Sequence, residues 1–97
     1  MFYTSLQTVI EVANIAGSNE LQDLIQGSAY VHKQAIESKN KFLVVSAPKL
    51  KGNDNKVVYS VHSVDSYGSV KSETGLKRLG SLDRAISYCE SLANKGY

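Results

Sequence analysis

Residues 57–64, VVYSVHSV, constrain the fold of this chain most, because their side chains alternate with the period of two that is typical of a β-strand. The alternation places Tyr59 and Val61 on one face of the strand, and His62 and Val64 on the other. This is the clearest strand of the sequence, and it makes a β-sheet the centre of the expected fold.

Two further strands are predicted on either side of it. Residues 42–45, FLVV, are apolar at every position and indicate a strand that is covered on both faces. A third, more polar strand is predicted over residues 69–74, after a tight turn at residues 65–68. Lys71 and Glu73 are typical of an edge strand, because charged side chains discourage pairing with other molecules.

Helical periodicity dominates the N-terminal part of the chain. Residues 4–16 place apolar side chains at the i, i+3, i+4, i+7 spacing of one helix face, and Gly17 ends the helix. Ser18 is predicted to cap a second helix. Two interpretations fit residues 19–39: two helices with a break at Gly27, or one helix with a central glycine, which costs about 1 kcal/mol relative to alanine. We favour the break.

The last helix is predicted to begin after Ser81, its N-cap, and to carry an apolar stripe that includes Cys89. A chain of 97 residues makes one domain. We therefore predict a single small α+β domain over residues 1–97, a three-stranded antiparallel β-meander packed against two to three N-terminal helices and one C-terminal helix. The element order is α-α-(α)-β-β-β-α, and the sheet face away from the helices is predicted to be partly open.

The sequence also narrows the class of protein. Its single cysteine excludes an internal disulfide and with it a disulfide-stapled secreted scaffold. No apolar run approaches the roughly 20 residues that a membrane span needs. The N-terminal residues lack the basic segment of a signal peptide, and Glu11 interrupts their apolar run. We expect a cytoplasmic protein without a membrane partner.

The motifs of catalysis and cofactor binding are missing from the sequence. The two histidines, His32 and His62, lie thirty residues apart, and no spacing typical of zinc sites is present. His32 is expected near the apolar flank of a helix, and Cys89 is expected to be buried and unreactive. No serine lies in a GxSxG motif, and residues 75–81, GLKRLGS, are not a Walker motif. This segment is expected to be a strand-to-helix turn, and the alternative is an anion or phosphate contact at the start of the last helix. We predict no enzyme, no metal and no cofactor.

Charge is distributed unevenly along the chain. Residues 1–32 carry a net charge of −3, and residues 33–97 carry a net charge of +5. The stretch 33–56 has six lysines against Glu37 and Asp54. It forms either a solvated surface that keeps the protein soluble or a contact with the phosphate backbone of double-stranded RNA or DNA. The candidate nucleic-acid-binding residues are Lys39, Lys41, Lys49, Lys51, Lys56, Lys77 and Arg78.

A helix, three antiparallel strands and a closing helix is also the element order of double-stranded RNA-binding domains, which residues 19–94 resemble. Residues 80–85, GSLDRA, are similar to the start of that family's last helix, where a serine precedes basic residues and then an alanine. Leu82 and Asp83 stand where the family has its basic residues, and the Gly-His pair of its first hairpin loop is absent. The resemblance implies RNA binding, but without the family's phosphate contacts.

Six tyrosines stand out in a chain of this size. Tyrosine is favoured at protein interfaces because it buries a large ring and keeps a hydroxyl for hydrogen bonds. The candidate protein-binding residues are Tyr59, Tyr67, Lys71 and Glu73. We predict a non-catalytic protein-binding module, monomeric or homodimeric. By analogy of size and plan it is similar to the small inhibitors or adaptors that phages and mobile elements encode, such as anti-CRISPR proteins. The alternative is a nucleic-acid-binding protein.

Overall fold

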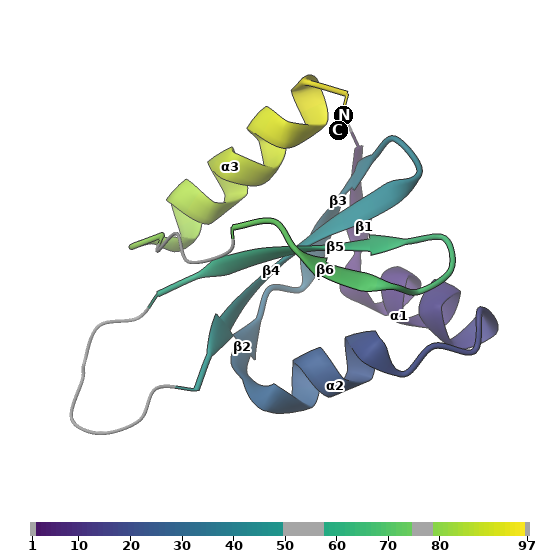
Figure 1. Cartoon of the computed structure of the whole chain (residues 1–97). Helices are drawn as coiled ribbons and strands as arrows, with labels where there is room; N and C mark the ends of the chain where they lie inside the picture. The colour runs from purple at the N-terminus through teal and green to yellow at the C-terminus, as the bar shows by residue number, and fades with distance from the viewer. Residues whose placement is uncertain (1, 50–57, 75–78, 97) are drawn as a thin grey trace.

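Three helices and six strands make up the part of the chain that the computed structural model describes, residues 2–49, 58–74 and 79–96 (Figure 1). In chain order they are β1 (Phe2–Ser5), α1 (Leu6–Ile15), α2 (Glu20–Gly27), β2 (Ser28–Val31), β3 (Gln34–Ser38), β4 (Lys41–Pro48), β5 (Ser60–Asp65), β6 (Val70–Ser72) and α3 (Leu82–Asn94). They form one α+β domain, as predicted. None of these helices is long and apolar enough to span a membrane.

All strand pairs are antiparallel, and the strand order is β1-β3-β4-β5-β6, with β2 also paired to β4. The first part of β4 pairs with β3 and its last part pairs with β2. β2 and β3 therefore follow one another along β4, interrupted at His32 and Lys33. His32 N–H donates to the carbonyl of Val45 at 2.9 Å and continues the ladder across the interruption. The edge position predicted for residues 69–74 is confirmed by β6.

The predicted three-stranded meander and its element order are wrong. The described order is β-α-α-β-β-β-β-β-α, because residues 28–38 form β2 and β3 rather than helix, and β1 precedes α1. Ala35 and Ile36 fit one helix face, but adjacent residues of a strand point to opposite faces, and the two lie in different apolar clusters. Pairing with β1 and β4 decides the conformation here. The likeness to the element order of double-stranded RNA-binding domains fails for the same reason.

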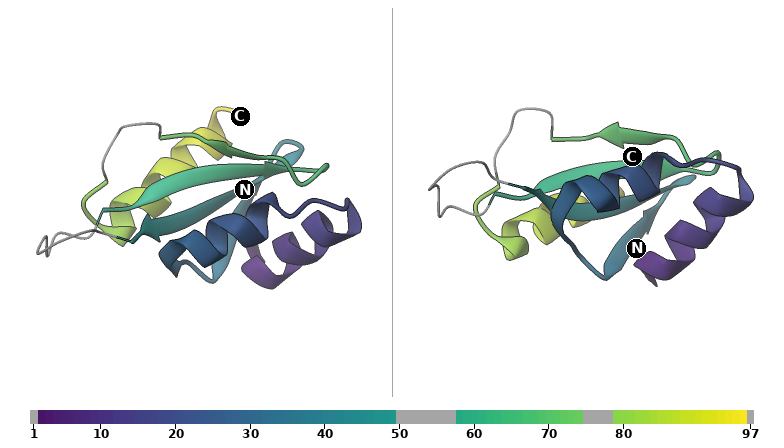
Figure 2. Two further views of the ribbon diagram at one scale, coloured as in Figure 1. Left: turned by 60° about the horizontal axis from the view of Figure 1, so that its bottom comes forward. Right: turned by 90° about the horizontal axis from the view of Figure 1, so that it is seen from below.

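Helices cover both faces of the sheet, so the predicted open face is also wrong. Figure 2 shows α1 and α2 on one face and α3 on the other. Under α3 the buried cluster comprises Ile36, Leu43, Val45, Val61, Leu79, Ala85 and Cys89. Under α1 and α2 it comprises Val9, Ala13, Leu21, Ala35, Val44 and Val64. Successive residues of β4 alternate between the two clusters, which confirms the prediction of a strand covered on both faces.

Several predicted caps and turns are confirmed. Ser81 is the N-cap of α3, and its Oγ accepts a hydrogen bond from the Arg84 N–H at 3.1 Å. Gly17 follows α1 with a φ of +79°, a conformation that glycine adopts without steric cost. The turn at residues 65–68 is closed by a hydrogen bond of 3.0 Å from the Gly68 N–H to the Asp65 carbonyl.

Ser18 has a different role from the predicted cap. The N-cap of α2 is Asn19, whose side chain makes no capping bond, and Ser18 Oγ accepts from the Glu20 N–H at 3.3 Å. The same hydroxyl donates to the Gly68 carbonyl at 2.7 Å. This hydrogen bond links the connection between α1 and α2 to the turn between β5 and β6.

Candidate functional site

The four predicted protein-binding residues lie along β5 and β6 but do not gather in one place. Tyr59 is half-buried just before β5, whereas Tyr67 lies in the turn after β5 and is 79% exposed. The length of β5 separates these two tyrosines by roughly 20 Å. Lys71 is exposed on β6, and Glu73 is half-buried just after it. Tyr59 and Tyr67 therefore cannot belong to one compact pocket.

The described lysines of the 33–56 stretch lie at separate places along the sheet. Lys39 and Lys41 lie at the turn from β3 to β4, with Asp65 opposite Lys41 in the ladder. Lys49 follows β4 at the other end of that eight-residue strand. Lys33 lies in the interruption between β2 and β3. The other candidate nucleic-acid-binding residues, Lys51, Lys56, Lys77 and Arg78, fall outside the described residues.

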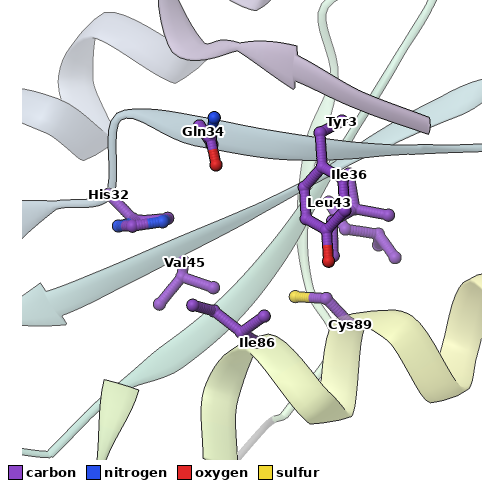
Figure 3. Close-up of a pocket in the computed structure, with 8 residues that line it drawn as sticks. All are labelled: Tyr3, His32, Gln34, Ile36, Leu43, Val45, Ile86 and Cys89. Atoms are coloured by element: carbon purple, nitrogen blue, oxygen red, sulfur yellow. The ribbon is translucent and has the colours of Figure 1, made fainter. Parts of the chain in front are cut away.

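A pocket of about 220 Å³ lies between α3 and the sheet (Figure 3), and we call it the α3 pocket. Its lining residues are Tyr3, His32, Gln34, Ile36, Leu43, Val45, Ile86 and Cys89. The register explains why the strand residues meet here: Tyr3 lies opposite Ile36, and Ile36 lies opposite Leu43, so all three share the face under α3. Ile86 and Cys89 complete the wall from the helix side.

Polar groups border this apolar pocket at its two ends, as Figure 3 shows. At one end the Tyr3 hydroxyl donates to Oε1 of Glu90 at 3.0 Å. This hydrogen bond raises the pKa of Tyr3 above its ordinary 10.0. At the other end are the side chains of His32 and Gln34. The pocket thus combines an apolar interior with hydrogen-bonding groups at its border, which is the usual composition of a binding site.

Three aromatic side chains beside the pocket contact one another, and we call them the tyrosine–histidine cluster: Tyr30, His32 and Tyr59. The rings of Tyr30 and Tyr59 are perpendicular, with an interplanar angle of 89° and centroids 6.3 Å apart. The hydroxyl of Tyr30 lies 2.9 Å from Nδ1 of His32. His32 belongs to both the cluster and the lining of the pocket. Tyr59 contacts Tyr30 and Tyr30 contacts His32, so the cluster is continuous with the pocket.

The predicted burial of Cys89 is confirmed, since its side chain is fully buried at the floor of the pocket. Burial raises the pKa of the Cys89 thiol to about 12. The thiol is therefore neutral at physiological pH and behaves as a small apolar group rather than as a nucleophile. In the described part of the chain, no group of three His, Cys, Asp or Glu side chains could hold a metal ion.

Sequence reasoning missed most of this site. It placed His32 on the flank of a helix, whereas His32 lies between β2 and β3, and it gave Tyr3 and Tyr30 no specific role. The sequence offers no clear strand signal here, because residues 30–36, YVHKQAI, do not alternate between apolar and polar side chains. The helical spacing of the apolar residues in the same segment therefore prevailed.

No protein-family model matches the chain, and neither a curated protein nor a solved structure matches it. The fold and the site define a small α+β domain with an apolar pocket beside its C-terminal helix. We therefore infer its function from its own residues.

His62 is an unusual residue on the other face of the sheet, opposite Val44 and Ser72. Its Nδ1 atom is buried and has no hydrogen-bond partner among the described residues. Burial holds the pKa of His62 below its ordinary 6.5, and the nearby carboxylate of Glu73 offsets part of this effect. The folded state therefore takes up a proton at His62 less readily than the unfolded state does.

This difference predicts a pH-dependent stability. We expect the free energy of unfolding to decrease as the pH falls below about 6.5, because protonation of His62 favours the unfolded chain, and to level off below the folded-state pKa. His62→Gln should flatten this part of the pH dependence, whereas His32→Gln, which keeps His62, should retain it. Urea denaturation at a series of pH values measures the effect. An equal pH dependence in His62→Gln and the parent chain would contradict the prediction.

Proposed function

We propose that this chain is a non-catalytic protein-binding module, and that its recognition surface is the α3 pocket together with the tyrosine–histidine cluster. The observation that carries the proposal is the exposure of aromatic rings around an apolar pocket. Tyr3 is 51% exposed and Tyr30 is 40% exposed, and an apolar pocket of about 220 Å³ adjoins both Tyr3 and His32.

The chemistry of the surface supports a protein partner. Tyrosines that surround an apolar pocket are typical of interface hot spots, where an anchoring side chain of the partner enters the pocket. Tyr30 is held by its ring contact with Tyr59 and by its hydroxyl contact with His32. A ring that is already fixed loses little conformational entropy on binding, so the surface is preorganised.

By analogy of size and α+β plan alone, the role we propose is that of an inhibitor or adaptor, of the kind that phages and mobile elements encode. The alternative partner is nucleic acid, bound through the lysines of the 33–56 stretch. We prefer the protein partner because the exposed aromatic rings lie beside a pocket, whereas Lys39 and Lys49 lie at opposite ends of β4 and neither lines the α3 pocket. Nuclease treatment and salt distinguish the two, because phosphate contacts weaken steeply with salt.

We expect Tyr30→Ala and Tyr59→Ala each to weaken partner binding at least about tenfold, the usual loss when a hot-spot residue is truncated. Tyr67→Ala is the matched control, because Tyr67 is 79% exposed at the far end of β5. The tagged chain and its variants are used to capture proteins from nuclease-treated extract of the source cells at low and high salt. The affinity of the captured protein is then measured with each purified variant.

Each variant must first show the thermal unfolding of a folded protein, because Tyr59 also packs against the buried cluster under α3. Loss of binding in Tyr67→Ala alone would place the interface at the turn between β5 and β6 and refute the proposed surface. Recovery of nucleic acid that is released at high salt would support the alternative function.

A further inference from the structure

We infer that the α3 pocket receives a neutral phenolic ring, and that this ring is the side chain of a tyrosine on the partner protein. The assignment of the ring to a partner protein rests on the proposed function. The preference for a phenolic ring rests only on the lining of the pocket.

The size and the lining of the pocket suit one aromatic ring. An apolar cavity of about 150 Å³ accepts benzene, so the α3 pocket, at about 220 Å³, has room for a ring with a substituent. Leu43 and Val45 of β4 form one wall, and Ile86 of α3 faces them from the other layer. These aliphatic side chains offer apolar contacts to both faces of a ring that lies between the sheet and the helix.

The polar end of the pocket favours a hydrogen-bonding substituent on that ring. Nδ1 of His32 lies 2.9 Å from the Tyr30 hydroxyl, which leaves the Nε2 edge of the imidazole for a ligand. When Tyr30 donates to Nδ1, Nε2 carries the proton and donates to a hydroxyl oxygen. The side-chain amide of Gln34, also in the lining, can accept the hydroxyl proton in turn. A ring without a hydroxyl would form neither hydrogen bond and would displace water from the half-buried imidazole without replacing its hydrogen bond.

The opposite end of the pocket disfavours an anionic ligand. The Glu90 carboxylate accepts the Tyr3 hydroxyl there at 3.0 Å, and a second negative charge nearby would be repelled. The floor is the fully buried Cys89 side chain, which offers no charge to a ligand. A phenol is uncharged near neutral pH and meets both conditions, whereas a carboxylate-bearing ring does not.

The chemistry is tested with the full chain and the simplest probes of the ring. Chain labelled with ¹⁵N is titrated with p-cresol and with toluene, and amide shifts are followed by NMR. We expect p-cresol to bind with millimolar affinity, as befits so small a ligand, and about three- to tenfold more tightly than toluene. Equal or tighter binding of toluene, or shifts centred away from the α3 pocket, would overturn the inference.

Two variants and one control variant locate the effect. Gln34→Leu, at an exposed position, should reduce the preference for p-cresol over toluene without weakening toluene binding. Ile86→Phe should fill the pocket and weaken both probes, whereas Ile10→Phe, against the cluster on the other face, should weaken neither. Amide spectra establish that each variant is folded. Retention of p-cresol binding by a folded Ile86→Phe would also overturn the inference.

The source of the ring is tested with the captured partner. If a partner tyrosine fills the pocket, saturating p-cresol and Ile86→Phe should both weaken capture at least about tenfold. Loss of capture in Tyr30→Ala but not in Ile86→Phe would leave the proposed function standing and refute the tyrosine anchor. Binding of p-cresol in the pocket with capture unaffected by any of these variants would refute the proposed function and the tyrosine source, but not the phenolic chemistry.

Discussion

Replacement of Gly68 by alanine is expected to lower the free energy of unfolding by roughly 2–5 kcal/mol, enough to reduce Tm by about 10 °C or more. Gly68 has a φ of +79°, and a Cβ atom placed there would lie 2.5 Å from Cβ of Ser18 and 3.3 Å from Cα of Ala13. The strained backbone costs about 1–2 kcal/mol for alanine, and the clash with α1 and its connection adds about 1–3 kcal/mol.

Gly17→Ala is a closely matched control. Gly17 has the same φ of +79°, but a Cβ atom there would meet nothing within 4 Å. It should therefore cost only the backbone term of about 1–2 kcal/mol. Urea denaturation followed by circular dichroism compares the two variants. Equal losses in Gly17→Ala and Gly68→Ala would show that the close approach of the turn to α1 contributes nothing.

The clash can also be tested by rescue. Ser18→Gly removes the nearest contacting atom, so adding it to Gly68→Ala should cost less than the sum of the two single changes. The single change Ser18→Gly removes the hydrogen bond of 2.7 Å to the Gly68 carbonyl and should itself be destabilising. Strict additivity would indicate that Ser18 and Gly68 do not interact in the folded protein.

The elements that sequence reasoning placed correctly have a local signal that nothing contradicts. The alternation of residues 57–64 predicts β5, although residue 57 itself falls outside the described residues, and the apolar run at 42–45 predicts β4. Ser81 and the apolar stripe after it predict α3. In each case the period, the cap and the turn agree, and the structure needs no long-range contact to decide between alternatives.

Residues 28–38 could not be placed from the sequence, because Val31, Ala35 and Ile36 fit a helix as well as a strand that is buried on both faces. Pairing with β4 stabilises the strand conformation over the helix. This long-range pairing cannot be recognised from the sequence of residues 28–38 alone. The same error affected the prediction of the site residues. Tyr59 was selected, but its neighbour Tyr30 was not, because only the strand geometry brings the two rings together. The α3 pocket depends on how α3 lies over the sheet, which no local pattern specifies.

Leu21→Ala is the second change with a large expected effect, a loss of about 2–5 kcal/mol in the free energy of unfolding. Leu21 is the single buried residue of α2 and lies in the cluster with Val9, Val44 and Val64. α2 has eight residues and no side-chain bond at its N-cap. A helix so short is not stable by itself, so its packing through Leu21 holds it on the sheet.

Leu24→Ala is the control that distinguishes the effect of removing a buried side chain at Leu21 from the effect of changing helix propensity. Both changes replace leucine by alanine within α2, so the propensity term is the same, but Leu24 is only partly buried against that cluster. We expect Leu24→Ala to cost about half as much or less, because it removes less apolar area from the core.

Circular dichroism and tyrosine fluorescence should report one common urea transition for Leu21→Ala. Tyrosine fluorescence can be followed because the chain has six tyrosines and no tryptophan. Because Leu21 contacts the same cluster as α1, β4 and β5, its loss should weaken the whole domain. An earlier, separate loss of helix signal would show instead that α2 unfolds independently of the sheet.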